Sequence, residues 1–131
     1  MKTILDTGPL VALMLAEDRW HDWAVETFKV VEPPLLTCEA VLAEAAYLTR
    51  QPADVIARIA GGALKVEMSM TQEAGAIERL LRRYAGRMDL ADACVVRLSE
   101  LRPKAKVLTL DVKGFTVYRR NGREAIPLLV P

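Results

Sequence analysis

This chain of 131 residues is poor in the residues that most readily mark a disulfide-bonded or zinc-binding protein. It has two cysteines, Cys38 and Cys94, which stand far apart without a CxxC spacing, and one histidine, His21. This pattern argues against a disulfide or a zinc site, so we expect both cysteines to be buried free thiols. His21 lies beside Trp20 and Trp23 near an expected helix start. We therefore interpret it as a partly exposed surface or interface residue rather than a catalyst.

The chain also lacks an excess of charge of one sign and a long apolar run. Its formal net charge is only +1, so any binding of nucleic acid must depend on local basic patches. The longest apolar run near the N-terminus, Pro9 to Ala16, is too short to span a bilayer. Glu17 and Asp18 follow that run at once, and no signal-peptide cleavage site is present. We expect no membrane segment and a cytoplasmic location.

What the chain has is apolar surface in an alternating order of elements. With 52% hydrophobic residues, it is expected to fold as one domain, residues 1–131, with a real core. Strands are expected at 2–6, 35–37, 63–68 and 106–110, with a short edge strand at 125–130. Helices are expected from Gly8-Pro9, over 19–31 and 39–49, from Pro52 to Gly61-Gly62, after a Thr71 N-cap, and from an Asp89 cap to Leu101. Strands separated by helices predict an α/β fold, a three-layer α/β/α sandwich with a mainly parallel central sheet.

Four acidic residues stand where acids are locally out of place. Asp6 and Asp111 close expected strands, Glu44 lies within an alanine-rich helix, and Asp92 opens an apolar helix. In open parallel sheets, ligands bind beyond the carboxyl ends of the strands. Carboxylates that meet there provide the oxygen ligands that hard cations such as Mg²⁺ prefer. The four acids together suggest metal-dependent phosphodiester chemistry.

Each acid also has an ordinary structural explanation. Asp6 opens an Asp-Thr-Gly-Pro turn, and Asp111 is a possible turn acid at a strand end. Glu44 shares a helix face with apolar residues, so it is either a snorkelling carboxylate at the edge of that face or a ligand. The rival acid in the same helix, Glu39, sits in the first turn and favours the helix dipole. We prefer Glu44.

Asp89 and Asp92 compete for one role. Asp89 is a natural N-cap, and Asp92 is either its capping partner or an acid that faces the site. We assign the cap to Asp89, with a possible outer role at the site, and the inner position to Asp92. Thr109 and Asp111 are expected to alternate to the same side of their strand, which would place a hydroxyl beside a carboxylate.

The chain resembles a PIN domain, and within that group it resembles the VapC-type toxins of prokaryotic toxin–antitoxin pairs. The matching stretches are Ile4-Leu5-Asp6-Thr7-Gly8-Pro9-Leu10, Leu42-Ala43-Glu44-Ala45, Leu90-Ala91-Asp92-Ala93, Leu108-Thr109-Leu110-Asp111 and the tail Gly114–Arg120. The resemblance implies an endoribonuclease that depends on Mg²⁺ or Mn²⁺, a cognate antitoxin and a homodimer. It also implies that Asp6, Glu44, Asp92 and Asp111 hold one or two ions, partly through waters. Thr7 or Thr109 would orient a metal-bound water.

Local basic clusters are the best candidates for RNA contacts. Arg82, Arg83 and Arg87 precede the Asp89 cap, and Arg119 belongs to a cluster near the C-terminus. Such runs are usually solvated faces, but in a chain with little net charge they are where phosphates would bind.

Two other functions conflict with single positions of the chain. A haloacid-dehalogenase-type phosphatase needs a second Asp where this chain has Gly8. A phospho-receiver domain needs an acceptor Asp at the end of the third strand, where this chain has Glu67-Met68-Ser69. A catalytically weak PIN-like module that binds RNA or protein remains the alternative. Trp20 and Trp23, close together on a short helix, suggest an apolar surface that a second copy would cover.

Overall fold

The computed structural model describes residues 1–131, which form a five-stranded sheet, a two-stranded hairpin and seven helices. The elements, in chain order, are β1 Thr3–Leu5, α1 Thr7–Met14, α2 His21–Val30, β2 Leu35–Thr37, α3 Glu39–Thr49, α4 Pro52–Ala60, β3 Leu64–Val66, α5 Met70–Arg83, α6 Leu90–Leu101, β4 Lys106–Leu108, α7 Val112–Phe115, β5 Arg119–Arg120, β6 Glu124–Ala125 and β7 Leu128–Leu129.

The central sheet has the strand order β3-β2-β1-β4-β7, and every neighbouring pair is parallel. Ile4 of β1 stands opposite Leu36 of β2 on one side and Val107 of β4 on the other. The chain therefore passes from β1 to β2 in one direction along the sheet and later returns to the other side of β1. The carboxyl ends of β1 and β4 meet at this reversal, where open α/β sheets bind ligands.

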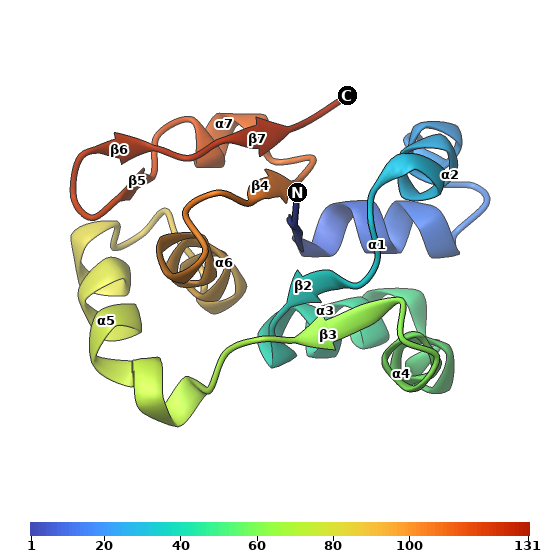
Figure 1. The fold of residues 1–131 in the computed structure, drawn as a ribbon, viewed down its shortest axis with the longest axis horizontal. Coiled ribbons are helices and arrows are strands. Elements are labelled where there is room, and N and C mark those ends of the chain that lie inside the picture. Colours follow the sequence, from blue (N-terminus) through green and yellow to red (C-terminus); the bar gives the residue numbers. More distant parts are fainter.

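Both faces of the sheet are covered, because successive strand residues point to opposite sides. Ile4 and Val107 belong to the core on the α5 and α6 side, whereas Leu5 and Leu108 pack with the layer that contains α1, α3 and α4. Figure 1 shows the same division, with α5 and α6 on one side of the sheet and α1 to α4 on the other. The expected three-layer α/β/α sandwich with a parallel sheet is confirmed.

Several expected details of the fold are wrong, including the third strand, which covers Leu64–Val66 and not residues 63–68. The N-cap of α5 is Ser69 and not Thr71, since Ser69 Oγ accepts the Gln72 N–H at 3.3 Å. The fourth strand ends at Leu108, two residues earlier than expected, because the chain turns there into α7. The edge strand is only Leu128–Leu129. Ala125, expected within it, instead pairs with Arg119 as part of β6 in the hairpin.

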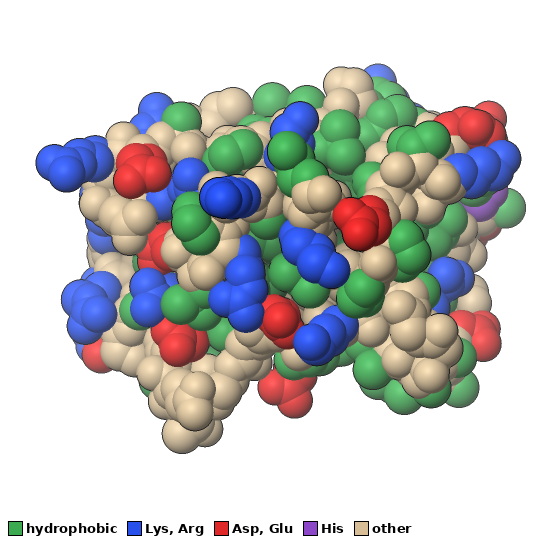
Figure 2. Space-filling model, viewed as in Figure 1, with side chains coloured by type: hydrophobic (Ala, Val, Ile, Leu, Met, Phe, Trp, Pro, Cys, Tyr) green, Lys and Arg blue, Asp and Glu red, His purple; other side chains and the backbone are tan.

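That hairpin joins β5 and β6 through Asn121 and Gly122, both of which have positive φ angles (50° and 81°). None of the helices is long and apolar enough to cross a membrane. Figure 2 shows Lys and Arg side chains spread over much of one face with acidic side chains between them, which agrees with the net charge of only +1.

Candidate active site

A cleft of about 380 Å³ lies beyond the carboxyl ends of β1 and β4. Five carboxylates from separate parts of the chain line it, together with five other residues. The acids are Asp6, Asp18, Glu44, Asp92 and Asp111, and the other residues are Thr7, Gly8, Val11, Leu48 and Leu110. The fold therefore gathers all four acids that were singled out in the sequence into one cleft. Their roles as ligands or catalysts stay a prediction.

Asp6 is the most deeply buried of these acids, with 6% of its surface exposed. Its N–H donates to Leu108 O at 3.0 Å, which continues the pairing of β1 with β4 by one residue beyond the strand. Burial raises the pKa of Asp6 to about 6, and the charges of Glu44 and Asp111 act in the same direction. A hydrogen bond from Thr109 opposes the rise without cancelling it. The ionised form of Asp6 is therefore less stable in the folded protein than in water.

Thr109 connects two of the acids. Its Oγ1 donates to Asp6 Oδ2 at 2.7 Å and accepts the Asp111 N–H at 2.9 Å. Thr109 is fully buried, so this hydroxyl fixes Asp6 relative to the turn that carries Asp111. The expected reason for their proximity, alternation along a strand, is wrong because β4 has already ended. The turn brings the two residues together instead.

Asp111 caps the short helix α7 and also lines the cleft. Its Oδ1 accepts the Gly114 N–H at 2.9 Å, and its side chain is exposed. A Cβ on residue 114 would overlap the Asp111 carboxylate, so any other residue there would force this carboxylate to move.

Asp92 and Asp89 form a reciprocal capping box at the start of α6. Asp89 Oδ1 accepts the Asp92 N–H at 2.8 Å, while Asp92 Oδ2 accepts the Asp89 N–H at 3.3 Å. Asp89 does not line the cleft, whereas Asp92 does. Burial raises the pKa of Asp92 to about 7, and the charges of Asp89 and Asp6 raise it further. Asp92 is therefore both a capping partner and a cleft acid.

Glu44 projects from the middle of α3 and is half-buried. No hydrogen bond or ion pair forms to its carboxylate, so nothing structural accounts for an acid at this position. Its rival Glu39 lies exposed in the first turn of the same helix and does not line the cleft.

Two residues of the site were missed in the sequence. Asp18 accepts the Trp20 N–H at 2.8 Å in the turn before α2 and lines the cleft beside α1. Tyr118, which is almost fully buried, places its hydroxyl 3.0 Å from Asp92 Oδ2 and 3.1 Å from Arg87 O. Burial raises the pKa of this phenol, so it remains a hydrogen-bond donor. The Asp18–Trp20 hydrogen bond is local, but the place of Asp18 in the cleft and the contact of Tyr118 with Asp92 depend on tertiary structure and have no local sequence signal.

A search of solved structures finds a chain with a similar fold. It is the toxin VapC20 of Mycobacterium tuberculosis, which cleaves the sarcin–ricin loop. The two sequences are 21% identical, and the structures match with a TM-score of 0.69 over 81% of this chain and 87% of the VapC20 chain. The chain has the VapC-type PIN fold. At this level of identity the likeness shows the fold alone. No protein-family model matches the chain, and no curated protein matches it in sequence.

Within this PIN fold, the cleft acids suit a hard cation by their chemistry. Every charged group that lines the cleft is a carboxylate, and the buried Thr7 Oγ1, which also lines it, has no hydrogen-bond partner. Oxygen donors of this kind are those that Mg²⁺ and Mn²⁺ prefer. No three of the His, Cys, Asp and Glu side chains lie close enough together to form a ready ligand set. The chemistry of the donors therefore fits such an ion.

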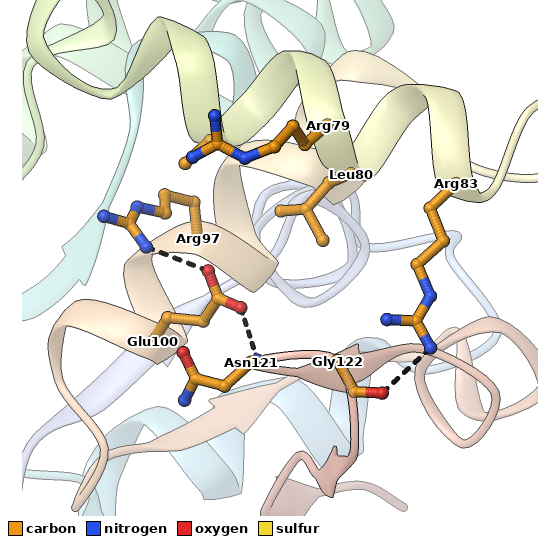
Figure 3. A pocket seen from close by; sticks show the side chains of 8 residues that line it. Arg79, Leu80, Arg83, Arg97, Glu100, Asn121 and Gly122 are labelled. Carbon is orange, nitrogen blue, oxygen red and sulfur yellow. Dashed lines mark hydrogen bonds and ion pairs between the residues drawn. The ribbon is translucent and has the colours of Figure 1, made fainter.

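The four arginines expected to contact RNA have different environments. Arg82 pairs with Glu78 at 2.9 Å, and Arg119 donates to the carbonyls of Thr116 and Tyr118. Arg83 donates to Gly122 O at 2.9 Å and lines a separate hollow of about 300 Å³ between α5, α6 and the hairpin (Figure 3). Arg87 is different from the other three because its side chain makes no hydrogen bond or ion pair and lines a groove beside the acidic cleft.

The remaining residues of interest are structural. His21 Nδ1 lies 2.8 Å from Ala12 O, which ties α2 to α1. Cys38 and Cys94 are buried free thiols, as expected. Trp20 and Trp23 are half-buried, and the guanidinium of Arg19 lies over the Trp20 ring at 4.8 Å.

Proposed function

We propose that this chain is an endoribonuclease that depends on a divalent cation, Mg²⁺ or Mn²⁺, and that it is the toxin of a toxin–antitoxin pair. The observation that supports this most is the meeting of Asp6, Glu44, Asp92 and Asp111, from four separate elements, in one cleft of a VapC-type PIN fold. These four carboxylates are the residues we propose as metal ligands, with Asp18 as an additional acid. RNA cleavage by VapC20 makes RNA the first substrate to test.

A divalent cation bound among these carboxylates would lower the pKa of a bound water and neutralise charge on the scissile phosphate. The chain's own residues prepare the site for it. Thr109 holds Asp6 in place through a 2.7 Å hydrogen bond, and Tyr118 does the same for Asp92 at 3.0 Å. Glu44 has no hydrogen-bond or ion-pair partner within the protein, so its carboxylate is free to bind a metal ion. The unpartnered hydroxyl of Thr7 is available to orient a water or a phosphate oxygen.

The cleft contains no histidine, and the single histidine is engaged with the Ala12 carbonyl. Proton transfer would therefore fall to water and carboxylates. Burial raises the pKa values of Asp6 and Asp92 to about 6 and about 7 in the absence of an ion, so a cation bound between them would also hold both carboxyls in the ionised form.

The test is incubation of the purified protein, free of any antitoxin, with total RNA in Mg²⁺ or in EDTA. Cleavage in Mg²⁺ that EDTA abolishes is the expected result. Glu44→Gln should abolish cleavage, whereas Glu39→Gln, the same change on the exposed side of the same helix, should leave it intact. Equal activity of the two variants would remove Glu44 from the site.

A module that binds RNA or protein without cleaving it is the alternative. The observation in its favour is that no three of the acids lie close enough to form a ready metal site. Binding of RNA without cleavage in Mg²⁺ or Mn²⁺ would support the module over the nuclease.

We also propose a cognate antitoxin, a homodimer and a cytoplasmic location. Large apolar side chains are exposed on α3 and α4, with Tyr47 at 81%, Ile56 at 56% and Leu48 at 51%. An exposed apolar surface of this kind favours an interface. Light scattering of the purified protein tests the dimer, and a small open reading frame directly upstream would identify the antitoxin. A monomer at micromolar concentration would count against the dimer.

A further inference from the structure

A second groove of about 410 Å³ adjoins the acidic cleft. It is lined by six residues, Arg87, Asp111, Lys113, Gly114, Val117 and Tyr118. Asp111 lines both the groove and the cleft, and Tyr118 is hydrogen-bonded to the cleft acid Asp92. The two hollows therefore share a wall, and a chain molecule that crosses the cleft would continue into the groove.

The two hollows have opposite charge. The cleft carries five carboxylates, whereas the groove carries two cations, Arg87 and Lys113, and only the one shared acid. A polyanion is repelled by uncompensated carboxylates, so cations close to the cleft are needed to hold its phosphates. The groove supplies them next to the proposed site of cleavage.

The charges of Arg87 and Lys113 are not already used within the protein. Both side chains are exposed, and neither makes a hydrogen bond or an ion pair. Several other cations are engaged: Arg82 pairs with Glu78, Arg97 with Glu73 and Glu100, and Arg102 with Glu67. Exposed, unpaired cations are often merely solvated. Here the shared wall with the cleft distinguishes them from the rest of the basic surface.

The shape of the groove also suits a nucleic-acid strand. Gly114 leaves its part of the wall without a side chain, and Val117, at 39% exposure, offers a small apolar surface for a sugar or base. Resting on the proposed RNA cleavage, we infer that this groove binds the RNA backbone beside the scissile phosphate, with Arg87 and Lys113 each contacting a phosphate. An acidic protein segment is the competing occupant.

The experiment measures binding of fluorescein-labelled poly(U) by fluorescence anisotropy in EDTA over a range of KCl concentrations. Each phosphate contact to a single strand contributes about 0.7 to the slope of log Kd against log salt concentration. Arg87→Gln and Lys113→Gln should each lower that slope by about 0.7, and the double variant by about 1.4.

Arg79→Gln is the matched control, because Arg79 is also exposed and without a partner but lines the hollow of Figure 3, which shares no residue with the groove. It should leave the slope unchanged. If the groove variants had the same slope as wild type, the inference would be overturned and an acidic protein segment would be the remaining occupant. A loss of slope in Arg79→Gln as large as in the groove variants would also overturn it.

Cleavage of total RNA in Mg²⁺ by the same proteins separates this inference from the proposed function. If wild type cleaves RNA and the groove variants match it in KM and in salt slope, the groove fails and the nuclease stands. If wild type does not cleave but the slopes fall as expected, the groove stands and the nuclease fails. Absence of any RNA binding by wild type overturns the groove.

Discussion

Because the charge of buried Asp6 is uncompensated, we predict that Asp6→Asn changes the free energy of unfolding by an amount that depends on pH. Burial raises the pKa of this carboxyl from its ordinary value of 3.8 to about 6. At about 1.4 kcal/mol for each pH unit, ionised Asp6 costs the folded state about 3 kcal/mol, a large part of a typical domain's stability. Asn has almost the same shape and no charge. It should remove this cost where Asp6 is ionised.

The sign of the effect depends on pH. A carboxyl with a raised pKa holds its proton longer in the folded state than in the unfolded state. Its cost is therefore absent below pH 3.8, grows as the pH rises to about 6, and is complete above that value. Asn also replaces one of the two acceptor oxygens by an amide NH₂ group, and loss of the Thr109 hydrogen bond would cost about 1 kcal/mol at any pH.

In EDTA, Asp6→Asn should thus be slightly less stable than wild type near pH 4 and about 2 kcal/mol more stable near pH 7. Urea unfolding at a series of pH values measures the difference. The change in that difference with pH, about 3 kcal/mol, is independent of the lost hydrogen bond. Asp22→Asn, an exposed acid outside the cleft, is the control for the chemical change.

Metal provides the second half of this test. Under the proposed function, Mg²⁺ at ten times its dissociation constant should stabilise wild type by about 1.4 kcal/mol, and Asp6→Asn should lose most of that gain. A variant that is less stable than wild type at neutral pH, with an unchanged response to Mg²⁺, would refute the reasoning. Asp6 would then be a structural turn residue.

Two further predictions concern residues that position the cleft acids. Tyr118→Phe removes the hydroxyl that donates to Asp92 but keeps the buried ring, so cleavage and Mg²⁺ affinity should fall about 10- to 100-fold. Tyr84→Phe is the control, because the Tyr84 hydroxyl does not contact an acid. Gly114→Ala forces the Asp111 carboxylate from its place; cleavage should fall on the order of 100-fold, while the melting temperature shifts by only a few degrees. Unchanged cleavage by both variants in a total-RNA assay would show that the positions of these carboxylates do not matter.

Most of the fold was predictable because its signals are local. Strand β2 and helix α3 have the bounds expected from the sequence, since prolines and a change from an apolar run to helical periodicity mark their ends. The β5–β6 hairpin was missed although Asn121-Gly122 is a strong hairpin signal, because its flanking residues are mainly charged and do not alternate. Ser69 was missed as the N-cap although Gln72 follows at the spacing of a capping box.

The gathering of the acids followed from topology rather than from local sequence. Acids after β1 and β4 had to meet once those strands were neighbours in a parallel sheet, and this adjacency was an assumption until the strand order was known. Asp18 and Tyr118 had no such route to prediction. Asp18 reaches the cleft because α2 folds back on α1, and Tyr118 reaches Asp92 because the segment after α7 packs under α6.

The structural and functional interpretations of these acids are not exclusive. Asp6, Asp92 and Asp111 each stand at the start of a helix, where the positive end of the helix dipole and free N–H groups favour a carboxylate. These three acids all line the cleft, so the helix starts bring like charges together where the helix dipoles limit the cost of that charge. Glu44, in the middle of α3, has no such support, which makes it the acid least explained by folding. At Asp92 and Asp111, an Asp→Ala change would therefore confound loss of a capping hydrogen bond with loss of a ligand, whereas Asp→Asn retains a capping oxygen and isolates the charge.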